Sequence, residues 1–111
     1  MPDDSEDTRV RINALRKAYG EQLPAKLKEI EDTWTRLAGG AWNSGDFLAF
    51  HRAVHALAGS GAMFGFPELS TRARSLDLLL KPMGEGRETP DPEMVRRIAD
   101  GWTAIKEAAA R

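Results

Sequence analysis

Apolar residues recur along this chain at alternating steps of three and four, the spacing that places side chains on one face of an α-helix. No segment shows the strict alternation of a strand, so the pattern predicts helices throughout. We expect the first helix to be short and to end at Gly20. The second should have Pro24 in its first turn and stop at Gly39 and Gly40. Their apolar faces comprise Thr8, Ile12, Leu15 and Tyr19 in the first helix, and Leu23, Leu27, Ile30, Trp34 and Leu37 in the second.

The second half of the chain predicts three further helices. One follows the segment NSGD, and another opens at Pro67. The segment KPMGEGRETPDPE has the proline, glycine and charge density of a loop. Within it, Asp91 is expected to cap the last helix, with Pro92 in the first turn. The apolar faces comprise Phe47, Phe50, Val54, Leu57 and Gly61, then Leu69, Ala73, Leu76 and Leu80, and finally Val95, Ile98, Trp102, Ile105 and Ala109.

Four long amphipathic helices joined by short turns favour an all-α fold, an up-and-down antiparallel four-helix bundle with a short extra N-terminal helix. A length of 111 residues suits one domain with one core. We therefore expect a single domain over residues 1–111, with the core bundle at about residues 21–110. The residues expected to pack in the core or at its boundary are Trp34, Trp42 and Trp102, and the leucines at 78–80 are expected to form a buried helix end.

Composition excludes several classes of partner. The chain has 17 acidic and 16 basic residues, so neither nucleic acid nor a membrane surface is expected to bind it. It has no cysteine, which excludes disulfides and thiolate metal sites. The start, MPDDSEDTR, lacks the apolar segment of a signal peptide, and no apolar run approaches the ~20 residues of a membrane span. We expect a monomeric, cytoplasmic protein.

The third predicted helix carries two histidines four residues apart, His51 and His55. At about 100° per residue, His55 lies about 120° from the centre of the core stripe, and His51 about 85° from it. His55 is therefore expected to be exposed and His51 to lie at the boundary. One turn beyond His55, Gly59 weakens the helix and adds no packing, which makes sense if another protein must come close to the histidine. The remaining neighbours of His55 on the outer face are Leu48, Arg52 and Ala62.

Gly59 and Ala62 form a clearing beside His55, a surface without large side chains. The chemistry that suits an exposed histidine beside such a clearing is phosphoryl transfer. An imidazole with an ordinary pKa of ~6.5 is mostly neutral in the cytosol, and neutral imidazole is a good nucleophile. One alternative is an ordinary surface histidine. Another is a zinc site, because His51 and His55 have the i, i+4 spacing of a ligand pair. Asp and Glu are absent between Phe47 and Phe66, so this helix offers no third ligand and the zinc alternative is disfavoured.

In this region the sequence resembles the histidine phosphotransfer (HPt) domains of two-component phosphorelays. Those domains share a histidine, an apolar residue two on, lysine three on, glycine four on, a small residue five on and glycine ten on. His55, Leu57, Gly59, Ser60 and Gly65 match this pattern. The resemblance covers roughly residues 20 to 82 through specific motifs, and the rest through the helix pattern alone. The similar flanks are GDFLAFHRAVH, which includes Gly45 and Asp46, and FGFPELSTRARSLDLLL.

The resemblance implies a phosphoryl carrier rather than an enzyme. His55 would accept a phosphoryl group from the aspartate of a response-regulator receiver or from a sensor kinase, and would pass it to another receiver aspartate. In that family Mg²⁺ and its acidic ligands belong to the receiver, so we expect no cofactor and no metal on this chain. The residues expected to dock the partner around His55 are Leu48, His51, Arg52, Ala58, Gly59 and Ala62.

One departure from the family pattern concerns charge. Ala58 stands where the family has lysine, which removes a cation that could screen the phosphoryl oxygens. Arg52, three residues before His55 on the same exposed side, could supply that charge, or it could be an ordinary solvated arginine. The departure also makes an alternative function conceivable, a silent HPt-like adaptor that binds receivers without phosphotransfer.

Overall fold

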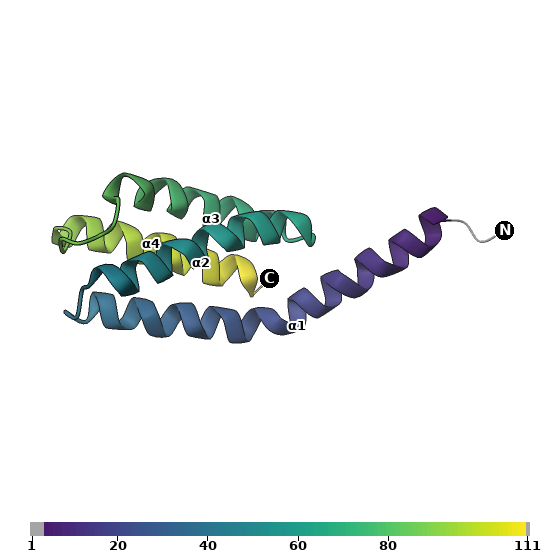
Figure 1. Ribbon diagram of the computed structural model, residues 1–111, viewed down its shortest axis with the longest axis horizontal. Coiled ribbons are helices and arrows are strands. Elements are labelled where there is room, and N and C mark those ends of the chain that lie inside the picture. The colour runs from purple at the N-terminus through teal and green to yellow at the C-terminus, as the bar shows by residue number, and fades with distance from the viewer. Residues whose placement is uncertain (1–3, 111) are drawn as a thin grey trace.

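The computed structural model describes residues 4–110, and every regular element within that range is helical. The elements are α1 (Asp4–Ala38), α2 (Ser44–Met63), α3 (Pro67–Leu80), the short 3₁₀ helix η1 (Lys81–Met83) and α4 (Pro92–Ala109). Consecutive helices lie side by side and reverse direction at each connection, and α4 returns to contact α1 (Figure 1). The chain is a helical bundle.

The N-terminal third of the chain is one helix, so the predicted break at Gly20 is wrong. α1 runs for 35 residues, and Gly20 and Pro24 both lie inside it. Alanine, glutamate, glutamine and lysine around Gly20 are strong helix formers, and together they outweigh its cost of about 1 kcal/mol. Pro24 has no N–H to donate to the carbonyl of Gly20, and proline inside a helix bends it. Figure 1 shows α1 bending where its N-terminal part leaves the bundle.

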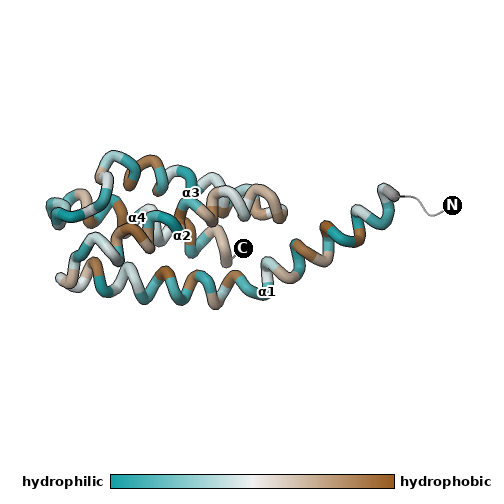
Figure 2. Tube along the Cα trace, in the orientation of Figure 1, coloured by the Kyte–Doolittle hydropathy of each residue, from teal (hydrophilic) through white to brown (hydrophobic). Residues whose placement is uncertain are grey.

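The N-terminal part of α1 projects from the bundle instead of capping it. Residues 5–17 are all exposed, and the molecule extends 61 Å along its longest axis against 23 and 22 Å across. Ile12 and Leu15 remain 39% and 55% exposed, while Tyr19, on the same predicted stripe, is 5% exposed. Apolar positions continue along the projecting segment in Figure 2. The stripe is thus continuous in sequence, but it meets the other helices only from Tyr19 onward.

The core contains the apolar faces predicted for the remaining helices. Phe50 lies at its centre, stacked on Trp34 with ring centroids 5.3 Å apart and edge-on to Trp102 at 6.1 Å. Trp34 and Trp102 are buried, and Trp42 is half-buried, as predicted. The predicted buried helix end at residues 78–80 is only partly right, because Leu80 is buried but Leu78 is 63% exposed. The other buried apolar side chains include Leu23, Ile30, Leu37, Phe47, Val54, Leu57, Leu69, Ala73, Leu76, Ile98 and Ile105.

The helix ends follow the capping rules. The side chain of Asn43 accepts the backbone N–H of Asp46 at 2.8 Å and begins α2. The predicted cap Asp91 accepts the N–H of Met94 at 2.8 Å, and Pro92 occupies the first turn of α4. Pro67 begins α3 as predicted.

Two glycines near the end of α2 allow α3 to come close. A Cβ on Gly61 would lie 3.2 Å from the backbone N of Ser70 and 3.3 Å from the carbonyl oxygen of Phe66. Gly65, in the turn, has φ +86°, a backbone conformation that side chains other than glycine rarely adopt. Glycine at these positions lets α3 pack directly along α2, and this close packing positions the site described below.

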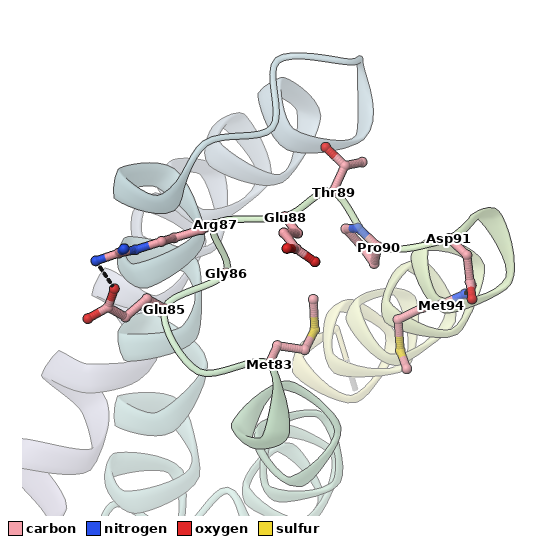
Figure 3. Close-up of a pocket in the computed structure, with 9 residues that line it drawn as sticks. All are labelled: Met83, Glu85, Gly86, Arg87, Glu88, Thr89, Pro90, Asp91 and Met94. Atoms are coloured by element: carbon pink, nitrogen blue, oxygen red, sulfur yellow. Dashed lines mark hydrogen bonds and ion pairs between the residues drawn. The ribbon is translucent and has the colours of Figure 1, made fainter.

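The loop between η1 and α4 surrounds a hollow of about 740 Å³ (Figure 3). Trp42 anchors the loop, because its Nε1 donates to the carbonyl oxygen of Gly86 at 2.9 Å. Gly86 has φ +64°, and any side chain there would collide with the ring of Phe47. The lining holds no histidine or cysteine and consists of Met83, Glu85, Gly86, Arg87, Glu88, Thr89, Pro90, Asp91 and Met94. The contacts of Trp42 and Gly86 give this loop a structural role at the end of the bundle.

Candidate functional site

His55 lies in the middle of α2, with its side chain 76% exposed, as its helical position predicts. It is nevertheless not a free surface group. Its Nδ1 lies 3.0 Å from Oδ2 of Asp77, which α3 supplies from across the helix pair. One ring nitrogen is therefore held by the protein, while the exposed remainder of the ring faces solvent.

Asp77 binds both histidines at once. Its second oxygen, Oδ1, lies 2.7 Å from Nε2 of His51, and the carboxylate is only 15% exposed. Burial acts to raise the pKa of Asp77, but hydrogen bonds from His55 and then His51 outweigh burial, so the net pKa is lowered. The group is ionised at neutral pH and can only accept hydrogen bonds. Each imidazole must therefore present an N–H to it.

This shared carboxylate determines the tautomer of each imidazole. His55 donates from Nδ1, so in the neutral ring Nε2 carries the lone pair. His51 donates from Nε2 and is 22% exposed, as expected for a boundary position. Of the two rings, His55 alone combines a high exposed fraction with an unprotonated nitrogen directed away from Asp77. It is the candidate nucleophile.

A hollow of about 320 Å³ lies beside His55, between α2 and α3. Its lining comprises His51, Arg52, His55, Asp77 and Lys81. Both cations are exposed, and neither has an ion-pair partner among the side chains that the structure describes. The site thus combines one partly buried anion, two imidazoles and two unpaired cations.

The clearing predicted beside His55 is present. Gly59 is exposed, and a Cβ built there would meet nothing within 4 Å. Ala62 is also exposed, so no large side chain at Gly59 or Ala62 projects from the surface beside His55. A partner's surface can approach the imidazole from this side.

Two of the six residues predicted to dock a partner are placed differently from the prediction. Ala58 is 7% exposed, and its carbonyl oxygen accepts a hydrogen bond from Ser70 Oγ at 2.5 Å. It therefore belongs to the α2–α3 interface, because α3 packs closely enough along α2 to cover this flank. Leu48 is half-buried and packs against the core, so it is not the freely exposed leucine that the helical wheel predicts.

The small residues of the motif build the scaffold and do not touch His55. Ser60 Oγ donates to the carbonyl oxygen of Ala56 at 2.8 Å, and Tyr19 Oη lies 2.8 Å from the same Oγ. Since the serine proton is used on Ala56, Tyr19 donates the second bond and ties α1 to α2. Gly65 forms the turn into α3. These residues position the helix that carries the histidine.

Asp77 is the site residue that sequence reasoning missed. The periodicity of α2 relates the histidines only to residues of their own helix, whereas Asp77 lies on α3. A signal was available, because Asp77 interrupts the sequence LDLLL between two core positions, Leu76 and Leu80. A carboxylate at the edge of an apolar stripe usually has a partner, since burying an unpaired charge is costly. No group of three His, Cys, Asp or Glu side chains among those that the structure describes has an arrangement that could hold a metal ion.

Comparison with known proteins identifies the family. The sequence model of the Hpt domain matches residues 6–108, nearly the whole chain. No curated protein and no solved structure matches significantly. The chain belongs to the Hpt domain family, whose members are phosphocarriers with a histidine phosphotransfer role in phosphorelays and interact there with response-regulator receivers and kinases. None of the helices in the described part of the chain is long and apolar enough to cross a membrane.

Proposed function

We propose that this protein is a phosphorelay intermediate that carries a phosphoryl group on Nε2 of His55. The observation that carries the proposal is the hydrogen bond between Nδ1 of His55 and Asp77, on an imidazole that is 76% exposed. That bond leaves Nε2 with its lone pair, and Gly59 leaves room for a donor to approach. We assign the role of phosphoacceptor to His55 and not to His51, whose Nε2 is engaged by Asp77.

The transfer needs no proton movement on this chain. The lone pair of Nε2 forms the bond to phosphorus as the bond between phosphorus and the donor aspartate oxygen breaks, and its electron pair stays on that oxygen. The Nδ1 proton remains in place, so the ring of His55 becomes a phosphoimidazolium. Asp77 then faces a positive ring at 3.0 Å and stabilises it. In the reverse direction the electron pair of the N–P bond returns to Nε2.

The remaining parts of the transfer machinery belong to the partner. Phosphoryl transfer depends on positioning and charge neutralisation, and we assign the Mg²⁺ ion and its acidic ligands to the receiver. The docking surface on this chain comprises His55, Arg52, Gly59 and Ala62, with Leu48 at its half-buried edge. We propose that the chain works as a cytoplasmic monomer, an up-and-down bundle with no cofactor of its own.

The experiment that tests the proposal is transfer from a phosphorylated receiver domain. The purified chain should gain a phosphate that is labile in acid and stable in alkali, as expected for a phosphohistidine. His55→Gln should abolish labelling and leave the thermal stability nearly unchanged, because the side chain lies outside the core. Labelling that survives in His55→Gln would contradict the assignment.

A second candidate function rests on position 58. Ala58 replaces the lysine of the family pattern and is buried, so it supplies no cation and no docking contact. A silent adaptor would keep the bundle and bind receivers without taking up phosphate. The same transfer experiment separates the two functions, because an adaptor would co-elute with the receiver and remain unlabelled.

A further inference from the structure

His55 and Asp77 alone do not neutralise the negative charge that a phosphoryl group brings to the site. A phosphoryl group on Nε2 brings about two negative charges to a site whose carboxylate is already ionised, and the positive imidazolium ring balances only one of them. Like charges at short range repel strongly where water is partly excluded. Position 58, where a cation is expected, is a buried alanine. The positive charge must come from elsewhere.

The structure brings a lysine to the site from outside the histidine helix. Lys81 directly follows α3 and keeps a helical backbone, with φ −54° and ψ −45°. Its N–H donates to the carbonyl oxygen of Asp77, so its side chain lies one turn beyond Asp77 and along the same side of α3. Lys81 also lines the hollow beside His55 and has no ion-pair partner in the described part of the chain.

We propose that Lys81 binds the phosphoryl oxygens during transfer to and from His55, and so supplies the charge that Ala58 lacks. The inference rests on the function proposed above. Arg52 lines the same hollow from α2, so one cation comes from the histidine helix and the other from the segment directly after α3. A lysine ammonium offers three N–H donors on a flexible stem, which suits a group that moves between two proteins.

An ordinary structural role for Lys81 makes a different prediction. A cation at a helix C-terminus stabilises the helix through its dipole, typically by 0.3–1 kcal/mol. Removing it would then lower the melting temperature and leave the chemistry unchanged. A docking role would weaken binding of the receiver but would not affect a small phosphodonor.

The test is labelling by phosphoramidate, a small donor that needs no docking surface. In this reaction the bond between phosphorus and nitrogen of the donor breaks, ammonia leaves, and phosphorus bonds to the imidazole. Four proteins are compared: the native chain, Lys81→Gln, Lys81→Arg and a matched control, Arg96→Gln. Arg96 is an exposed cation on α4 that does not line the hollow.

We expect Lys81→Gln to slow labelling about tenfold, the scale of one lost hydrogen bond to a charged group. Lys81→Arg should restore most of the rate, and Arg96→Gln should label like the native chain. Labelling of Lys81→Gln at the native rate, with or without a lower melting temperature, would overturn the proposal. A defect seen with a receiver but not with phosphoramidate would overturn it as well, since it would make Lys81 a docking residue.

The same experiment separates this inference from the proposed function. If the native chain is labelled on His55 and Lys81→Gln is labelled equally fast, only the role of Lys81 fails. If the native chain takes no phosphate from either phosphoramidate or a phosphorylated receiver, or if His55→Gln is still labelled, the proposed function fails and the role of Lys81 fails with it.

Discussion

Oδ2 of Asp77 lies 3.0 Å from Nδ1 of His55, and this contact across two helices gives the exposed imidazole a defined tautomer and orientation. A histidine without it would exchange its proton between two nitrogens and rotate freely about its side-chain bonds. The carboxylate is itself held by His51 at 2.7 Å on its other oxygen. The reactive group is therefore exposed, while the residues that position it are mostly covered.

Asp77→Asn tests that positioning role. An amide cannot be ionised, so it would no longer stabilise the phosphoimidazolium. Its NH₂ group only donates hydrogen bonds, so its single oxygen would be left to accept from the two rings. We expect labelling of His55 to slow about tenfold or more, the scale of a hydrogen bond to a charged group. Nitrogen NMR of the unphosphorylated proteins should also show that the tautomer of His55 differs between Asp77→Asn and the native chain. An unchanged tautomer together with an unchanged rate would show that Asp77 has only a structural role.

Gly59→Leu tests the clearing beside His55. A Cβ at this position would meet nothing within 4 Å, and leucine is the better helix former, so the melting temperature should stay equal or rise. Transfer from a receiver should become much slower because the receiver cannot approach. Labelling by phosphoramidate should be nearly normal, since that donor is small.

Gly61→Leu is the matched comparison for this steric argument. It lies two residues further along α2, where a Cβ would be 3.2 Å from the backbone of Ser70. We expect this variant to lose stability by separating α2 from α3. Normal receiver transfer in Gly59→Leu would contradict the account of the clearing.

Two leucines of α1 test the unexpected course of this helix. Leu15 is 55% exposed on the projecting part, whereas Leu23 is 3% exposed within the bundle. Leu23→Ala should cost about 2–5 kcal/mol of unfolding free energy, and Leu15→Ala should stay within about 0.5 kcal/mol of the native chain. Urea denaturation measures both. A large loss in Leu15→Ala would mean that the N-terminal part of α1 packs on the bundle in solution.

Acid unfolding provides a test of the contact between α1 and α4. The N–H of Trp102 donates to Glu31, and Lys106 lies 3.2 Å from the same oxygen. The hydrogen bond from Trp102 is the largest cause of the lowered pKa of Glu31, which has an ordinary value of 4.5. A lowered pKa in the folded state adds stability above pH 4.5, and this stability is lost as the pH falls through the folded value.

The melting temperature should therefore fall less between pH 7 and pH 3 in Glu31→Gln than in the native chain. Glu29→Gln, on an exposed position of the same helix, serves as the control and should follow the native profile. Equal pH profiles for the Glu31→Gln variant and the native chain would show that Glu31 contributes no pH-dependent stability.

The features that sequence predicted correctly are those set by local pattern. The cap at Asp91, the start of α3 at Pro67, the exposure of His55 and the open space at Gly59 follow from residue type and helical period alone. The predicted stop at Gly20 is wrong because the helix formers around this glycine outweigh its local stop signal. Pro24 lies inside the same helix instead of starting a new one.

The features that sequence missed depend on how two helices meet. Asp77 reaches the histidines only because Gly61 lets α3 pack closely along α2. The same approach covers Ala58, which a single-helix wheel cannot show. Lys81 reaches the site for a related reason, since its position follows from where α3 ends. Each of these residues is positioned by tertiary packing, on which the periodicity of one helix carries no information.

The most direct test of the central claim is to identify the phosphorylated atom. The chain is labelled by a phosphorylated receiver, and phosphorus and nitrogen NMR then assign the N–P bond, with His51→Gln and His55→Gln measured alongside. We predict a single phosphate on Nε2 of His55, retained in His51→Gln and absent in His55→Gln. A phosphate on Nδ1 of His55, or on His51, would contradict it.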